Sequence, residues 1–315
     1  MDRHTAQART LYLARHGSRA YGLDTPTSDT DYKGVLAPTK AQALGFTQQF
    51  EQFEAREPDD LVLYTLQKFF KLAEACNPSI IEVLFVDEGD VVSSSPEGDR
   101  LREARGLFLS QRAFGTFTGY AMSQLSRIQT HRGWLLNPPE GEPLREHYDL
   151  PPQPIVPKGQ LGAAMTVIER QGTAGFDTNF LEMLDREKRW RAAHNNWKQY
   201  ESWKRGRNPA RAALEAQFGF DLKHATHLIR LLRMGEEIIA RGDVIVRRHD
   251  REELMAIKEG RWSYDQLAEH AEALMARMKG LMHDRSALAV PEAPDTPALE
   301  ALCVELMESA LTRLG

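Results

Sequence analysis

Two aspartates separated by one residue are the first feature of this sequence that could do chemistry. Asp29 and Asp31 precede an apolar stretch that ends at Leu36, and Gly17-Ser18 follows an earlier apolar stretch, Leu11–Arg15. Because residues i and i+2 of a strand point to one side, both carboxylates would face the same way. Adjacent carboxylates repel each other unless a cation lies between them. Oxygen ligands of this kind suit Mg²⁺ or Mn²⁺, which complete their coordination with water and substrate phosphates.

A turn suited to phosphate lies between the two apolar stretches. Gly17 allows the backbone to approach a triphosphate closely, and Ser18 adds a hydroxyl and a backbone N–H for phosphate oxygens. Arg19 follows directly and is well placed to contact phosphates. A lone Gly-Ser or Asp-x-Asp is usually an ordinary strand end. Their combination at this spacing, between two apolar strands, favours a nucleotide and metal site.

These residues resemble the signature of the DNA polymerase β-like nucleotidyltransferase superfamily. The signature is Gly-Ser, ten further residues and Asp-x-Asp, as at Gly17-Ser18 and Asp29–Asp31. The fuller patterns at residues 17–22 and 28–35 are similar to a narrower branch, the RNA-repair-pathway nucleotidyltransferases. Thr30 departs from the superfamily, in which an apolar residue usually separates the aspartates.

Two later blocks resemble the same branch, and the resemblance runs in patches over about residues 11–265. The last block is Lys223-His224-Ala225 with His227 and Arg230. The earlier block contains Asp60, Tyr64, Lys68-Phe69, Asn77-Pro78 and Glu82. The resemblance implies a third metal carboxylate on a neighbouring strand, for which we choose Asp60. Asp59 is the alternative, since a strand slip of one residue would exchange their faces.

The resemblance implies a metal-dependent, NTP-using enzyme. It would move a nucleoside monophosphate to an RNA 3′-hydroxyl, release pyrophosphate and act in RNA repair. Two Mg²⁺ or Mn²⁺ ions would be held by Asp29, Asp31 and Asp60, one activating the attacking hydroxyl and the other stabilising the leaving group. Two alternatives are nucleotidylation of a protein or small molecule, and a non-catalytic nucleotide or RNA sensor. The three aspartates speak against a sensor, which need not retain them.

Further nucleotide contacts are expected on the motif turn and on one later helix. Tyr21 belongs to the turn pattern. Lys223, His227 and Arg230 share a face of the helix expected over residues 221–240, and would turn a cationic face towards nucleotide phosphates or RNA. The alternative is a helix whose histidines pack between domains.

A basic segment offers a candidate RNA contact. Residues 186–211 contain nine Lys and Arg but only two Glu, within a chain of net charge −5. Four aromatic residues interleave with these cations, and aromatic faces can stack on unpaired bases. Their spacing is nevertheless more typical of core packing, with the charged face free for RNA. We expect the RNA contacts at Arg189, Lys198, Lys204 and Arg207.

The predicted fold is α/β plus α, with a small mixed sheet in an N-terminal nucleotidyltransferase domain (residues 1–105). A mainly helical domain for nucleotide and acceptor binding would follow (residues 106–315). Strands are expected at 11–15, 32–36 and 60–65, and a helix at 66–75, while 79–86 fits a strand or a short helix. Later helices are expected at 110–130, 178–201, 221–240, 263–282 and from 296.

Composition narrows the class of protein further. Apolar residues make up 42% of the chain and charged residues 27%, which is ordinary for a globular protein. The only two cysteines, Cys76 and Cys303, exclude a disulfide scaffold and a cysteine-rich zinc site. The sequence contains no run of eighteen apolar residues and therefore predicts no transmembrane helix. We therefore expect a cytoplasmic protein without a membrane partner; the sequence does not predict an oligomeric state.

Overall fold

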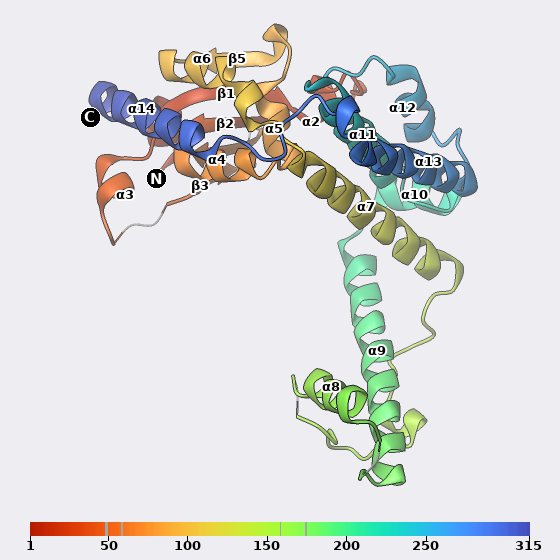
Figure 1. Cartoon of the computed structure of the whole chain (residues 1–315). Coiled ribbons are helices and arrows are strands. Elements are labelled where there is room, and N and C mark those ends of the chain that lie inside the picture. The colour runs from red at the N-terminus through yellow and green to blue at the C-terminus, as the bar shows by residue number, and fades with distance from the viewer. Residues whose placement is uncertain (48–49, 58, 158, 174) are drawn as a thin grey trace. The chain divides into compact units, whose positions relative to one another are not determined.

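The computed structural model describes residues 1–47, 50–57, 59–157, 159–173 and 175–315. The chain forms two compact units, whose elements can be followed in Figure 1. The first unit comprises Met1–Ile128 and Leu222–Gly315, and the second comprises Gln129–Asp221. The boundary expected at residue 105 falls inside the first unit, whose first stretch runs on to Ile128 and which the chain enters again at Leu222. As a division between catalytic and acceptor-binding functions, that boundary stays a prediction.

A five-stranded mixed sheet forms the centre of the N-terminal part, in the order β3-β4-β2-β1-β5. The strands are β1 (Thr10–His16), β2 (Asp31–Leu36), β3 (Gln52–Ala55), β4 (Asp60–Thr65) and β5 (Val91–Ser94). β2 pairs with β4 in parallel, and the other neighbours pair antiparallel. The three predicted strands are confirmed to within one residue at each end. The four-residue strands β3 and β5 were not predicted, because each is short and carries little apolar pattern.

The two faces of the sheet bury different partners. On one face, Leu36, Leu61 and Leu63 pack with Ala6 of α1 (Arg3–Ala8). On the other face, α4 (Leu66–Glu74) and α5 (Pro78–Leu84) lie against the strands. The hydroxyl of Tyr12 on β1 donates to the backbone oxygen of Val83 at 3.1 Å. This second face carries the aspartates, so its helices determine what surrounds them.

The segment that fitted either a strand or a helix is the helix α5. The side chain of Asn77 accepts a hydrogen bond from the backbone N–H of Ser79, and Pro78 occupies the first helical turn. Both features initiate helices, since Asn satisfies an orphan N–H and Pro needs no N–H partner there. Most side chains of α5 are buried, which explains why its apolar run showed no periodicity.

Helices complete the first unit. Its remaining α-helices are α2 (Gly17–Ala20), α3 (Lys40–Leu44), α6 (Pro96–Glu103), α7 (Arg112–Leu136, which continues into the second unit), α11 (Leu222–Arg241), α12 (Arg251–Lys258), α13 (Tyr264–His283) and α14 (Thr296–Leu314). Its 3₁₀ turns are η1 (Glu88–Asp90), η2 (Arg105–Phe108) and η4 (Arg285–Ala287). The helices expected from residues 66, 110, 221, 263 and 296 are confirmed. Ser263 caps α13 in a reciprocal capping box with Gln266.

The second unit is helical. Its further elements are η3 (Arg145–Tyr148), α8 (Leu161–Gln171), α9 (Thr178–Gly206) and α10 (Pro209–Phe218). A buried carboxylate fastens the proline-rich segment to α9. Glu187 accepts from Arg145 at 2.7 Å and from Arg191 at 2.8 Å, and Arg145 also donates to the backbone oxygen of Pro151. Residues 137–157, which are rich in proline and contain η3, are thus otherwise irregular but held in place.

Among the described residues, no helix is both long and apolar enough to span a bilayer.

One glycine of α11 tests how tightly the first unit's helices pack. A Cβ atom at Gly235 would lie 2.8 Å from the end of Met278 on α13 and 2.9 Å from Cβ of Phe117 on α7. We therefore expect Gly235→Ala to lower the free energy of unfolding by about 1–3 kcal/mol. The control is Gly119→Ala, at an exposed position of α7 where nothing lies within 4 Å. It should raise that free energy by about 0.5–1 kcal/mol. Urea denaturation measures both, and equal effects would contradict the packing.

Candidate active site

The parallel pairing of β2 with β4 brings two predicted metal carboxylates together. Asp31, the first residue of β2, is the register partner of Asp60, the first residue of β4. Register partners on adjacent strands point to the same face of a sheet. Leu61 and Leu63 point to the opposite face and are buried there, while Asp60 is exposed. Asp60 rather than Asp59 is therefore the neighbour of Asp31.

Asp29 lies in the loop that enters β2, and the backbone around it is held by Arg19. The guanidinium of Arg19 donates to the backbone oxygens of Ser28 at 2.7 Å and Asp29 at 3.2 Å. A turn precedes this point, since the N–H of Ser28 donates to the backbone oxygen of Thr25 at 2.9 Å. Arg19 was expected to contact phosphates. In this structure its guanidinium stabilises the loop, and a phosphate contact stays a prediction.

The Gly17-Ser18 turn lies directly against the carboxylate of Asp31. His16, the last residue of β1, is the register partner of Asp31, so the turn begins beside that aspartate. Gly17 has a positive φ of 72°, and a Cβ atom there would lie 2.2 Å from Oδ2 of Asp31. Glycine is required on both grounds, because any side chain would strain the backbone and displace the carboxylate. The side chain of Ser18 is half-buried next to it.

The electrostatics of this corner favour a bound cation. Burial raises the pKa of the Asp31 carboxyl, and the neighbouring carboxylates of Asp29 and Asp60 raise it further. Lys223 and Lys33 offset only part of this effect. Asp29 and Asp60 lie within electrostatic range of Asp31, and carboxylate oxygens of this kind are the ligands that suit a hard divalent cation such as Mg²⁺ or Mn²⁺.

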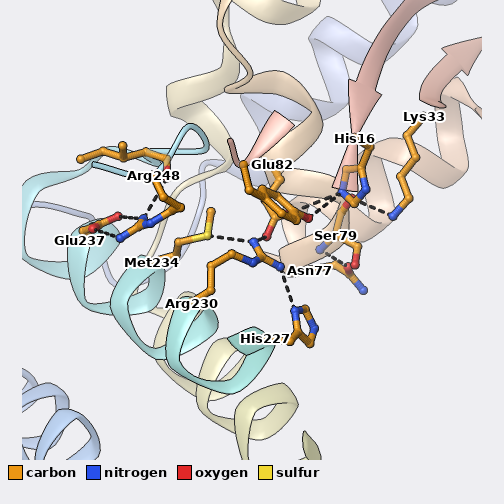
Figure 2. A network of polar contacts seen from close by, with 12 residues as sticks. His16, Lys33, Asn77, Ser79, Glu82, His227, Arg230, Met234, Glu237 and Arg248 are labelled. Carbon is orange, nitrogen blue, oxygen red and sulfur yellow. Dashed lines mark hydrogen bonds and ion pairs between the residues drawn. The ribbon is translucent and has the colours of Figure 1, made fainter. Parts of the chain in front are cut away.

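A buried polar network lies behind the turn, and Figure 2 shows residues of β1, β2, α5 and α11 meeting there. Glu82 of α5 is 1% exposed and accepts from the Tyr21 hydroxyl and from Nη1 of Arg230, both at 2.5 Å. Nε2 of His16 lies 3.3 Å from the same carboxylate. Burial alone would raise the pKa of Glu82, but Arg230, His16 and Tyr21 hold it well below its usual range.

Two residues expected to bind nucleotide therefore lie beneath the surface. Tyr21 is buried, and the guanidinium of Arg230 lies 3.7 Å from the centre of its ring. Arg230 is 2% exposed, and both its terminal nitrogens are engaged within the protein. A direct contact of either side chain with a nucleotide stays a prediction, while the structure assigns both an internal role.

The three positions expected to form a cationic face of α11 differ sharply. Lys223 is exposed and lies within electrostatic range of Asp31. His227 is half-buried, and its Nδ1 accepts from Nη2 of Arg230 at 2.9 Å. Burial, followed by the charge of Arg230, lowers the pKa of His227 to about 3. His227 is thus neutral near pH 7, with its proton on Nε2, so among these three only Lys223 presents an exposed charge.

Residues of the segment 248–258, which no sequence motif marks, hydrogen-bond to the backbone of residues 21–23 after α2. The guanidinium of Arg251 donates to the backbone oxygen of Gly22 at 2.6 Å, and Nζ of Lys258 donates to that of Leu23 at 2.5 Å. The backbone N–H of Arg248 donates to the oxygen of Tyr21 at 3.1 Å. These contacts join residues more than 200 positions apart, and no local sequence pattern predicts them.

The predicted RNA-binding cations lie on and after α9 in the second unit, with unequal freedom. Lys198 is exposed, while Arg189 is exposed but pairs with Asp185 at 2.9 Å. Lys204 is also exposed, near the ring of Tyr200. Arg207 is paired at 2.6 Å with buried Glu215 and lies 4.1 Å from the ring centre of Trp203. Arg207 is therefore engaged within the unit.

The aromatic residues of the same segment pack against rings of their own unit. Trp190 stacks on His194 with ring centres 4.9 Å apart, and Trp203 lies 5.3 Å from Trp134 of α7. The indole N–H of Trp190 donates to the backbone oxygen of Pro143 at 2.9 Å. These contacts support the packing alternative for the rings, with the exposed cations on the outside.

Comparison with known proteins supports the resemblance. Residues 1–134 match the model of the RNA repair pathway DNA polymerase beta family. The match confirms the polymerase β-like nucleotidyltransferase branch for this part of the chain, which includes the Gly17-Ser18 turn and the three aspartates. No curated protein and no solved structure matches the chain. Activity as a nucleotidyltransferase in RNA repair is what the family suggests.

The half-buried, neutral state of His227 predicts an acid-sensitive fold. Its pKa of about 3 lies below the ordinary value of 6.5, so the unfolded chain binds the proton more readily. The free energy of unfolding should thus fall as the pH falls below about 6.5, with His227 contributing about 2 kcal/mol between pH 7 and pH 5. The variant His227→Gln, which keeps an acceptor for Arg230, should lose less stability over this interval.

Urea denaturation at both pH values measures the effect. The control is His249→Gln at an exposed position, which should retain the wild-type difference between pH 7 and pH 5. A His227→Gln protein as acid-sensitive as the wild type would contradict the assignment.

Proposed function

We propose that this chain is a metal-dependent nucleotidyltransferase that transfers a nucleoside monophosphate from an NTP to an RNA 3′-hydroxyl and releases pyrophosphate. The observation that carries the proposal is the register of Asp31 with Asp60 beside the Gly17-Ser18 turn. Asp29 lies two residues before Asp31 and interacts with it electrostatically. The family match supports nucleotidyl transfer and a place in RNA repair.

Asp29, Asp31 and Asp60 are the residues that would hold two Mg²⁺ or Mn²⁺ ions. The raised pKa of Asp31 supports this, because the same three carboxylates that repel one another would each be stabilised by a cation. Bound divalent ions supply charge stabilisation for the attacking and leaving oxygens in phosphoryl transfer.

The protein's own residues would do the positioning. The hydroxyl and backbone N–H of Ser18 would donate to phosphate oxygens, which Gly17 allows to approach closely. Lys223, exposed and near Asp31, would attract the triphosphate. Because nucleotidyl transfer leaves little covalent work to the enzyme, holding the α-phosphorus in line with the acceptor hydroxyl supplies most of the rate acceleration.

An RNA acceptor fits the charge of the second unit. Arg189, Lys198 and Lys204 are exposed along α9, and several cations in one stretch exceed what a small acceptor needs. Backbone phosphates of RNA supply matching negative charges.

The direct test incubates the protein with each labelled NTP, Mg²⁺ or Mn²⁺, and separate RNA, protein and small-molecule acceptors. Label joined to the RNA 3′ end supports the proposal. Label joined instead to a protein or a small molecule would establish the alternative acceptor class. NTP binding without transfer to any acceptor would indicate a sensor.

The carboxylates are tested by amide substitution. Asp31→Asn and Asp60→Asn should each lower kcat at least about 100-fold. Each substitution removes a ligand of the metal ions, whose charge would stabilise the transition state. In metal-free buffer Asp31→Asn should melt at or above the wild-type temperature, since repulsion among the aspartates is relieved. Transfer rates and melting curves measure both effects.

Asp59→Asn is the matched control, since Asp59 precedes β4 and is not the register partner of Asp31. It should keep wild-type kcat within about threefold, a bound set by the small effects typical of substitutions outside a site. Loss of activity in Asp59→Asn with retention in Asp60→Asn would overturn the carboxylate assignment.

The RNA surface is tested by removing only exposed cations. The triple variant Arg189→Gln, Lys198→Gln, Lys204→Gln should bind RNA more weakly, and its slope of log affinity against log salt should be shallower by about 2. Arg207 stays in place, because removing it would leave buried Glu215 without its partner. NTP affinity should not change.

The control removes three exposed cations of the first unit, Arg100, Arg261 and Lys279. It should keep the wild-type affinity and salt slope. If both triple variants weaken RNA binding equally, the loss of affinity reflects overall charge. That result would contradict a dedicated RNA-binding surface on α9.

A further inference from the structure

A single buried carboxylate contacts both ends of the motif turn. Glu82 accepts from the hydroxyl of Tyr21 and lies against Nε2 of His16. His16 is the residue immediately before Gly17, and Tyr21 immediately follows α2. The four residues from Gly17 to Ala20 are thus held between two contacts to one side chain of α5.

The same carboxylate holds α11. Nη1 of Arg230 donates to Oε1 of Glu82, while its guanidinium covers the ring of Tyr21 at 3.7 Å. Nη2 of Arg230 donates to Nδ1 of His227 at 2.9 Å, one turn earlier on the helix. Figure 2 shows the side chains of His16, Glu82, Arg230 and His227 linked in this order. α11 also carries the exposed Lys223, two turns from Arg230.

Stability alone gives a poor account of this arrangement. Burying a carboxylate and a guanidinium costs desolvation, and well-packed apolar side chains of similar volume often stabilise a fold as much or more. What an ion pair adds is direction, because a guanidinium and a carboxylate bond only in restricted geometries. The network therefore fixes where the turn lies relative to α11.

We infer that Glu82 is a positioning residue that acts through His16, Tyr21 and Arg230 to hold the Gly17-Ser18 turn and α11 in one arrangement. Its catalytic consequence rests on the proposed function, since the turn and Lys223 would hold the triphosphate from two sides. Its structural consequence, an ordered turn, can be measured without any activity.

The first test removes one hydroxyl. Tyr21→Phe keeps the ring beneath Arg230 but loses the hydrogen bond to Glu82. The matched control is Tyr12→Phe on β1, another buried tyrosine, whose hydroxyl bonds to the backbone of Val83. We expect amide hydrogen exchange in residues 17–23 to become at least about tenfold faster in Tyr21→Phe and to change less than twofold in Tyr12→Phe.

The second test removes the charge itself. Glu82→Gln is compared with Glu97→Gln, since Glu97 is 3% exposed and accepts from Arg313, Ser95 and Ser309 at the contact of α6 with α14. Both substitutions should lower the melting temperature, because each removes the negative charge with which an arginine pairs. Only Glu82→Gln should accelerate exchange in residues 17–23. If Glu82→Gln does not fold, the tyrosine pair alone decides.

Turnover at a temperature well below melting supplies the remaining readout. Tyr21→Phe and Glu82→Gln should lower kcat about 10- to 100-fold while KM for NTP stays within about threefold, since a misplaced turn impairs alignment more than binding. Tyr12→Phe and Glu97→Gln should keep wild-type kcat.

The outcomes separate the two ideas. If exchange is faster only in the Tyr21 and Glu82 variants and the wild-type protein transfers no nucleotide, the positioning role is supported and the proposed function is refuted. If the wild type is active and each variant has the same exchange rate and kcat as its matched control, the positioning role alone is overturned.

Discussion

The parallel pairing of β2 with β4 is the constraint on which the candidate site depends. It makes Asp31 and Asp60 neighbours, although a loop, α3 and β3 separate them along the chain. The register is fixed by burial on the other face of the sheet, where Leu61 and Leu63 contact the core. A slip of one residue would turn both leucines to the opposite face and present Asp59 in place of Asp60. The apolar core therefore sets the position of the carboxylates.

Two groups of acidic side chains near the turn are stabilised in opposite ways. Burial and the carboxylates of Asp29 and Asp60 raise the pKa of Asp31 at the end of the sheet, and the lysines nearby offset this only in part. Glu82, directly behind the turn, is fully paired inside the protein by Arg230, His16 and Tyr21. Under the proposed function the first group binds a cation from solution, whereas the second is buried and engaged within the protein, which suits it to hold the turn. His227 belongs with the second group, because Arg230 occupies its Nδ1 and burial keeps it neutral.

The second unit uses the same division between paired and exposed charge. Glu187 and Glu215 are buried and bind arginines that fasten the proline-rich segment and the end of α9. The aromatic side chains of α9 stack on rings of this unit. Lys198 and Lys204 stay exposed, so the surface offered to a polyanion is made of lysines and arginines carried on a packed helix rather than of free aromatic faces.

Local sequence determined most of the elements and the core of the site. Short apolar stretches predicted β1, β2 and β4, helical spacing predicted α4 and α11, and the motif placed Gly17-Ser18 and Asp29–Asp31 at the ends of two strands. The sequence left residues 79–86 open between a strand and a helix; the helix start at Asn77-Pro78 is the local signal that favours the helix.

Tertiary structure alone decided which residues meet. It made Asp60 the neighbour of Asp31, buried Tyr21 and Arg230 against Glu82, and returned the chain from Leu222 onward to the first unit. An arginine or tyrosine in a sequence has the same chemistry whether it faces solvent or a buried carboxylate. Whether its polar group is available to a ligand depends on a partner far away in the chain, and local patterns of spacing do not encode that partner.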